Sequence, residues 1–276
     1  MIVGRMRNDG KSKRAVVLLS GGMDSSTALA FAAHEGFTCY ALTFRYGQRH
    51  VREIYAAKQV ADSLGIEHLI VEIDLRETAQ SSALIGKLPI PKRRSPKMIA
   101  STIPATYVPA RNTIFLAVAL AWAEVLGARD IFTGANATDH SGYPDCRPSF
   151  FRAFERLANL ATKAGVHGHK LRVHAPFVNM PKSGILKRGI ALGVDYSLTH
   201  SCFDPSAEGL ACGECDACTL RLEAFTAAGL KDPIAYATTS GDRGVRRRNA
   251  LASESDDRGR AVAVDEDEDG SAATHQ

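Results

Sequence analysis

Long apolar runs are missing from this 276-residue sequence. The longest one, residues 114–125, contains Glu124 and is shorter than the roughly 20 residues that a membrane-spanning helix needs. The first residues are polar and basic, and they lack the apolar core of a secretory signal. Charge of one sign is also scarce, because the net charge is only +4. We therefore expect a cytoplasmic protein with no membrane partner. The small net charge by itself says little about nucleic acid, and we expect no direct nucleic-acid partner.

Cysteine is sparse too, and four of the six cysteines lie between residues 202 and 218. The string "SCFDPSAEGLACGECDAC" spaces Cys202, Cys212, Cys215 and Cys218 as C-x9-C-x2-C-x2-C. Two-residue spacers let thiolates converge on one ion, and four sulfurs fill the tetrahedral shell that Zn²⁺ prefers. We predict a structural zinc site that holds a helix starting near Thr219 against the sheet, without contact to the nucleotide chemistry. An iron–sulfur cluster or a redox-active pair is the alternative.

The string "VVLLSGGMDSSTALAFAAHEG", residues 16–36, predicts a buried strand, a tight turn and a helix. Gly21 and Gly22 allow the backbone to turn sharply and to approach a ligand closely. Free N–H groups and the helix dipole favour an anion at the start of the helix, where hydroxyl groups gather at Ser20, Ser25, Ser26 and Thr27. The string lacks the lysine of the G-x-x-x-x-G-K-[ST] P-loop. It predicts a phosphate cradle of another type, and the alternative is an ordinary turn that binds nothing.

Strand and helix patterns alternate along most of the chain. This alternation is typical of an α/β fold, in which a mostly parallel, doubly wound sheet carries helices on both faces. Ligands of such sheets bind at the carboxyl ends of the strands. The patterns predict further strands at Phe37–Phe44, His68–Leu75 and Asp130–Thr133, and helices at His50–Leu64, Asn112–Leu126, Phe150–Ala164 and Lys182–Leu192.

Several polar stretches interrupt this alternation. "YVPARN" puts Arg111 at a helix start, where the dipole disfavours a cation, so we predict that this arginine faces a phosphate or carboxylate. "GANATDHSGYPDCR", residues 134–147, is either a surface loop or part of a substrate pocket. The basic loop at 84–102 is expected to be solvated and mobile, with phosphate or RNA binding as the alternative. Residues 241–276 have little to bury and predict a disordered tail.

Five strings occur in the order that one family has them: "LLSGGMDSST", "FRYGQRH", "YVPARN", "GANATDHSGYPDCR" and "HSCF…CGECDACTLRLEAF…DP". The first resembles the PP-loop of N-type ATP pyrophosphatases. Together they resemble the 7-cyano-7-deazaguanine synthase family of the queuosine pathway, over roughly residues 14–236. The resemblance implies an adenine nucleotide alpha hydrolase-like fold and an ATP-dependent ligase that makes the nitrile from 7-carboxy-7-deazaguanine and ammonia. It also implies that ATP is cleaved to AMP and pyrophosphate, that Mg²⁺ bridges the phosphates, and that the protein is a homodimer.

The same resemblance implies which residues form the site. Asp24 and Arg111 would be catalytic. The nucleotide would contact Leu18, Leu19, Ser20, Gly21, Gly22, Met23, Asp24, Ser25, Ser26, Thr27, Thr43 and Phe44. The deazaguanine would contact Arg111, Asn112, Asp139, Ser141, Gly142, Tyr143, Asp145, Cys146 and Arg147. We divide the chain into an N-terminal extension (1–13), a PP-loop domain (14–199), a zinc-binding C-terminal segment (200–240) and the tail (241–276).

The sequence departs from the family at one position of interest. Relatives often carry an acid in a "K-x-E-I" string, where this chain has Gly184, so any contact of that acid is in doubt here. Two other functions are open at this point: a PP-loop enzyme that acts directly on tRNA, and a zinc-stabilised nucleotide sensor or scaffold. The first would need an RNA-binding module and a strongly basic face, and the small net charge weighs against it.

Overall fold

The structure, a computed structural model, describes residues 13–137 and 142–237. The predicted tail and residues 1–12 of the predicted extension lie outside these residues, as do two predicted substrate contacts, Asp139 and Ser141. In the described part of the chain, no helix is both long and apolar enough to cross a membrane.

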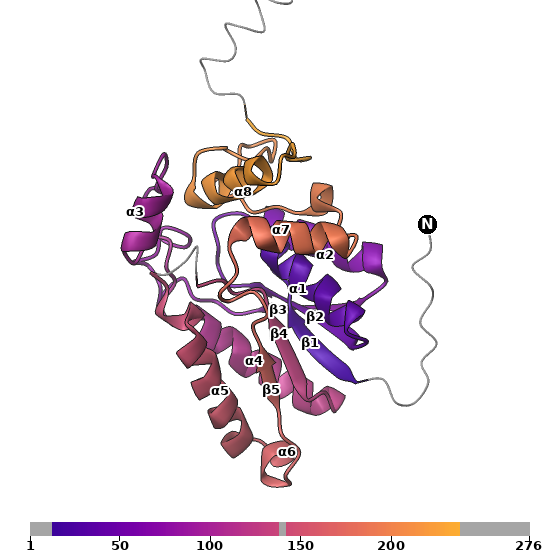
Figure 1. Ribbon diagram of the computed structural model, residues 1–276. Helices are drawn as coiled ribbons and strands as arrows, with labels where there is room; N and C mark the ends of the chain where they lie inside the picture. The colour runs from indigo at the N-terminus through magenta and orange to yellow at the C-terminus, as the bar shows by residue number, and fades with distance from the viewer. Residues whose placement is uncertain (1–12, 138–141, 238–276) are drawn as a thin grey trace, which may run out of the picture. The chain divides into compact units, whose positions relative to one another are not determined.

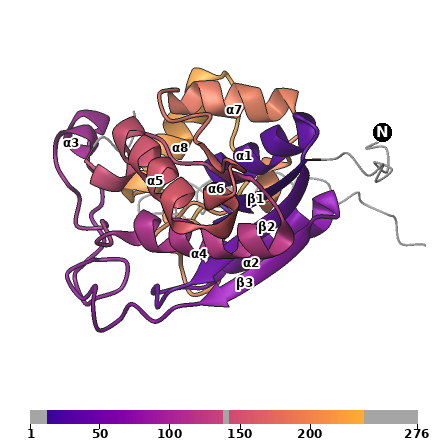
Figure 2. The same cartoon turned by 90° about the horizontal axis from the view of Figure 1, so that it is seen from below.

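Five parallel strands form one sheet in the order β3-β2-β1-β4-β5. The strands are β1 (Arg14–Leu18), β2 (Thr38–Arg45), β3 (Glu67–Glu72), β4 (Asp130–Thr133) and β5 (Arg172–His174). β1 is central, since Val16 is in register with Tyr40 of β2 and with Ile131 of β4. Figure 2 shows β1, β2 and β3 side by side toward one edge of the sheet. The predicted α/β fold with a doubly wound parallel sheet is confirmed.

Helices cover both faces of the sheet, because successive side chains of a strand point to opposite sides. Val16 belongs to the apolar cluster that includes α4 (Arg111–Leu126) and α5 (Pro148–Ala161). Val17 belongs to the cluster that includes α1 (Met23–His34) and α2 (Arg52–Leu64). Figure 1 shows these two pairs of helices on opposite sides of the strands.

The C-terminal helices α7 (Lys182–Ala191) and α8 (Asp216–Ala227) pack against each other, and α7 also packs against α1 (Figure 1). α8 begins before the predicted start near Thr219. Cys215 is its N-cap, and Asp216 is an acid in its first turn, which suits the positive end of the helix dipole.

The sequence patterns did not predict the short elements. These are β5, α3 (Pro96–Ser101), α6 (Lys163–Val166) and two 3-10 turns at Pro144–Cys146 and Tyr196–Leu198. α3 lies inside the basic loop and has Ser95 as its N-cap, whose Oγ accepts a hydrogen bond from the Met98 N–H at 3.4 Å. Part of that loop is therefore helical.

Candidate functional site

A cavity of about 230 Å³ lies at the carboxyl ends of β1, β2 and β4. Its wall is built from the turn after β1, the end of β2, the start of α4 and the residues after β4. This is the place where an open parallel sheet receives its ligands. The predicted site residues that line it are Leu18, Leu19, Ser20, Gly22, Met23, Asp24, Ser25, Thr43, Phe44, Arg111, Asn112, Tyr143 and Cys146.

Other predicted site residues do not line the cavity. Thr27 is buried, and its Oγ1 lies 2.8 Å from the Tyr196 hydroxyl oxygen. Asp145 stabilises the start of α4, because its Oδ2 accepts a hydrogen bond from the backbone N–H of Asn112 at 3.0 Å. Arg147 is exposed at the start of α5. The described members of this group are Gly21, Ser26, Thr27, Gly142, Asp145 and Arg147.

The turn after β1 has the form of an anion cradle. Gly22 is the N-cap of α1 and provides no side-chain cap, so the first N–H groups of the helix have no partner from that residue. The Ser25 hydroxyl fixes the turn, since its Oγ accepts from the Ser20 N–H and donates to the Gly22 carbonyl, each at 3.1 Å. Such a helix start favours a negatively charged group.

Lys182 supplies a cation to this turn and was missed by the sequence analysis. It begins α7, and its Nζ lies 2.7 Å from Oδ2 of Asp24. The two side chains are only 12% and 16% exposed, and both line the cavity. Oδ1 of Asp24 is buried and has no hydrogen-bond partner among the described residues. The carboxylate therefore has an oxygen available for a further ligand.

Arg111 lies on the cavity wall among aromatic and polar groups. Its NH1 donates to the Tyr46 hydroxyl at 3.2 Å, and its guanidinium carbon lies 5.7 Å from the centre of the Tyr46 ring. Phe44 and Phe115 stack beside this pair with ring centres 4.0 Å apart. Arg111 begins α4, as predicted, and lines the cavity; that it faces a phosphate or carboxylate stays a prediction.

Cys146 is held as a thiol. Burial raises its pKa to about 12, and its Sγ lies 3.3 Å from Nδ2 of Asn112. At neutral pH a thiol with this pKa is a weak nucleophile.

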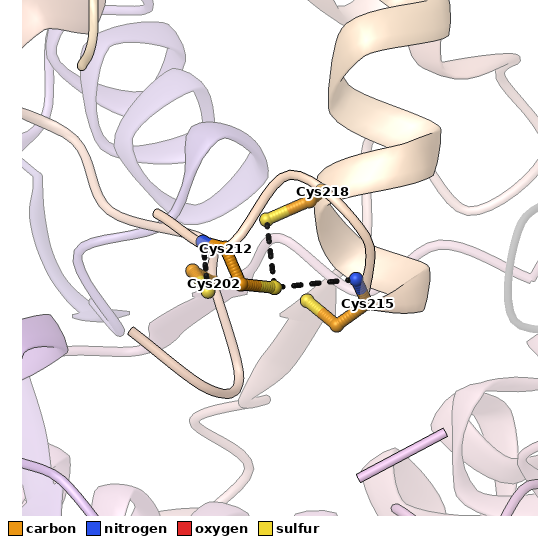
Figure 3. Close-up of side chains that lie close together, drawn as sticks. All are labelled: Cys202, Cys212, Cys215 and Cys218. Carbon is orange, nitrogen blue, oxygen red and sulfur yellow. Dashed lines mark hydrogen bonds between the residues drawn. The ribbon is translucent and has the colours of Figure 1, made fainter. Parts of the chain in front are cut away.

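The four predicted cysteine ligands come together (Figure 3). Their sulfur atoms all lie within 4.8 Å of one another. Backbone N–H groups point at three of the sulfurs: that of Asp204 donates to Cys202 at 3.3 Å, that of Phe203 to Cys215 at 3.4 Å, and that of Cys215 to Cys212 at 3.3 Å. N–H donors favour the charged form of a sulfur ligand. The cluster could therefore hold a metal ion.

The basic loop contacts the cysteine segment, which corrects the expectation of a wholly solvated loop. Lys92 forms an ion pair with Asp204, and Arg93 forms one with Glu214, each at 2.7 Å. Arg94 pairs with the nearly buried carboxylate of Asp216. Lys92 also makes an antiparallel bridge to Cys215. These three cations thus have acidic partners in the protein.

The segment that carries the cysteines also touches the turn after β1. None of the four cysteines lines the cavity, and that the metal site does not touch the nucleotide chemistry directly stays a prediction. The backbone N–H of His200 donates to the Gly21 carbonyl at 2.8 Å. The Met23 N–H donates to the Ser201 hydroxyl at 3.4 Å. His200, Ser201 and Phe203 line the cavity together with Ala217. One wall of the cavity therefore depends on the cysteine segment.

Comparisons with known proteins show the family of the chain. Residues 14–229 match the family model described as queuosine biosynthesis protein QueC. The chain belongs to the QueC family. A curated relative from Desulfatibacillum aliphaticivorans, named 7-cyano-7-deazaguanine synthase, is 58% identical over 82% of this chain and 97% of its own. One with the same name from Syntrophotalea carbinolica is 60% identical over the same shares. A solved NMN synthetase from Francisella tularensis is similar at 17% identity, with a TM-score of 0.42 over 93% of this chain and 90% of that chain.

Within the QueC match, the structure adds residues to the site that sequence reasoning did not assign. Besides Lys182, they include the polar side chains of Tyr46, Glu53, Asn136, His200 and Ser201. Tyr46 belongs to the "FRYGQRH" string, which carried the resemblance but had no predicted role, so its signal was present in the sequence. Asn136 lies in the polar stretch after β4, where the predicted substrate contacts begin only at Asp139.

Proposed function

We propose that this chain is an ATP-dependent ligase that converts 7-carboxy-7-deazaguanine and ammonia into 7-cyano-7-deazaguanine. One observation carries the proposal: the anion cradle after β1 and the Arg111 wall belong to the same cavity, so a nucleotide phosphate and an organic acid can meet there. Membership of the QueC family and the names of its curated relatives support this choice of substrate.

In this proposal the triphosphate of ATP binds to the cradle. The N–H groups at the start of α1 hold the departing pyrophosphate, and Lys182 supplies the positive charge that a P-loop lysine would give. The residues fit a Mg²⁺ ion as well, since Asp24 offers a buried oxygen with no described partner beside the cradle. Mg²⁺ bound there would offset charge on the phosphates.

The chemistry needs two activations of the same carbon. The substrate carboxylate attacks the α-phosphate of ATP, which forms an acyl adenylate and releases pyrophosphate. Ammonia displaces AMP from that adenylate and gives the amide. The amide oxygen then attacks the α-phosphate of a second ATP and releases a second pyrophosphate. Loss of AMP and of the two amide protons leaves the nitrile. Each of the two activations converts an oxygen that is a poor leaving group into an AMP ester, from which AMP leaves readily.

Arg111 has a defined part in this sequence. Its guanidinium is permanently charged, and only one of its N–H groups donates to Tyr46. The other N–H groups can bind the substrate carboxylate and orient it toward the α-phosphate. Asn112 and Cys146 form the neighbouring wall, and the raised pKa of the Cys146 thiol argues for binding rather than nucleophilic attack.

The cysteine cluster has a structural role in the proposal. Four sulfurs within 4.8 Å of one another fit the tetrahedral coordination of Zn²⁺, and four protein ligands leave no open position for a substrate. We further infer a homodimer, as the family resemblance implies, and a cytoplasmic location with ammonia as a substrate. The division at residues 14–199 and 200–240 remains part of the proposal.

The deciding experiment is mass spectrometry of the product formed from 7-carboxy-7-deazaguanine, ammonium and ATP. We expect the nitrile, with AMP and pyrophosphate as the nucleotide products. ADP and phosphate would contradict the adenylation chemistry. A strict requirement for added tRNA would favour a PP-loop enzyme that acts on RNA, and nucleotide binding without any turnover would favour a sensor.

A further inference from the structure

Apart from the contact of Tyr46 with Arg111, the segment from Tyr46 to Glu53 has no role in the proposed adenylation, although the side chains of Tyr46 and Glu53 line the cavity. Gln48 links them. Its Oε1 accepts a hydrogen bond from the Tyr46 N–H at 2.7 Å, and its Nε2 donates to Glu53 Oε1 at 2.9 Å. The side chain of Gln48 thus fixes the carboxyl group of Glu53 against the end of β2.

The Glu53 carboxyl group forms no ion pair with another described residue. Gln48 supplies the hydrogen bond to Oε1, and Arg111 acts on the charge of Glu53 from beyond ion-pair distance. Burial raises the pKa of Glu53, which means that its charged form is costly in this surrounding. An acid of this kind on a cavity wall would be stabilised by a ligand with N–H donors.

Two classes of donor could satisfy it: the ammonium ion and a ring with neighbouring N–H groups. The surroundings favour the ring. Arg111 is close enough to act on the charge of Glu53, and its own positive charge opposes a second cation. Phe44, Phe115 and Tyr46 present aromatic surface in the same cavity, which suits a flat heterocycle.

We infer that Glu53, positioned by Gln48, is the specificity-determining residue for the 2-amino-4-oxo edge of the deazaguanine ring. Its two carboxylate oxygens accept hydrogen bonds from the ring N–H and from the neighbouring exocyclic amino group. This inference rests on the proposed function, because it names the part of that substrate which the site reads. It predicts that the enzyme rejects rings that lack the amino group.

The test compares 7-carboxy-7-deazaguanine with the analogue that lacks the 2-amino group, in the wild-type chain and in Glu53→Gln. We expect the wild type to prefer the amino substrate by about 100-fold in kcat/KM, the scale of a charge-assisted hydrogen bond to a buried group. In Glu53→Gln the preference should fall below about 10-fold, while the KM for ATP stays unchanged. Glu72→Gln, on the exposed edge strand β3, is the matched control and should leave the preference intact.

The outcomes separate the two ideas. If the wild-type chain forms no nitrile, the proposed function is wrong. Nitrile formation with the same amino preference in Glu53→Gln overturns the present inference, and so does a variant whose main defect is a higher KM for ammonium. A purely structural role of Glu53 in the first turn of α2 would lower activity toward both substrates equally. If Glu53→Gln does not fold, Gln48→Leu decides the matter, because it frees the same carboxyl group and should weaken the preference several-fold.

Discussion

Replacing Gly21 by alanine tests how closely the nucleotide loop is packed into the domain. Gly21 has a φ of +79°, a conformation that costs an L-residue roughly 1–2 kcal/mol. A Cβ there would lie 2.2 Å from the Glu53 carbonyl oxygen and 2.5 Å from the Ala57 nitrogen, both in the backbone of α2. Because backbone atoms cannot rotate away, the overpacking adds about 1–3 kcal/mol. We expect Gly21→Ala to lower the free energy of unfolding by about 2–5 kcal/mol.

The matched control is Gly22→Ala in the same turn. Gly22 has a φ of −81°, and an added Cβ would find its nearest atom 3.5 Å away, so the cost should stay below about 1 kcal/mol. Thermal unfolding separates the two variants, since 1 kcal/mol corresponds to about 2–4 °C in a domain of this size. ATP affinity, measured by calorimetry, should fall with Gly21→Ala because the loop must shift. Equal losses of stability in both variants would refute the reasoning.

Three further predictions concern the cavity, the cysteines and the tail. Lys182→Met should lower kcat/KM for ATP by about 10²–10³-fold. Lys187→Met, on the exposed face of the same helix, should leave it unchanged. A similar kcat/KM in both variants would mean that Lys182 does not act in the site. Cys215→Ser should lower zinc content and melting temperature together, because structural zinc supplies folding free energy on the order of 10 kcal/mol. Metal analysis that finds iron with sulfide, or a variant that keeps its full zinc content and stability, would contradict a structural zinc site. Truncation after Thr239 should leave kcat nearly intact, since the composition of the removed residues offers little to bury, and a large loss would mean that the tail acts near the site.

The parts of the fold that were predicted are those whose signal is local. The strand, turn and helix at 16–36 carry their apolar periodicity and turn chemistry within one stretch, and the structure has them at that place. The four cysteines are likewise recognisable by spacing, because short spacers force neighbouring sulfurs together. Local patterns were sufficient for both.

The parts that were missed depend on partners far away in the sequence. β5 has only three residues and no apolar run, and it is held by contacts such as that between His174 Nε2 and Asp130 Oδ1 at 2.7 Å. Lys182 meets Asp24 across 158 residues, and the family string that begins at Lys182 does not indicate which residue is its partner. The basic loop was missed for the same reason. A run of basic residues predicts a solvated loop, and its acidic partners lie more than 100 residues away.

The contact between Ser201 and Met23 joins residues that are 178 positions apart. During synthesis the nucleotide loop leaves the ribosome long before the cysteine segment exists, because domains emerge from the N-terminal end. The turn after β1 therefore forms its last hydrogen bonds only after residues 200 and 201 have been made. Chains that are cut off before residue 200 would keep the strand and helix around this turn but lack these two contacts.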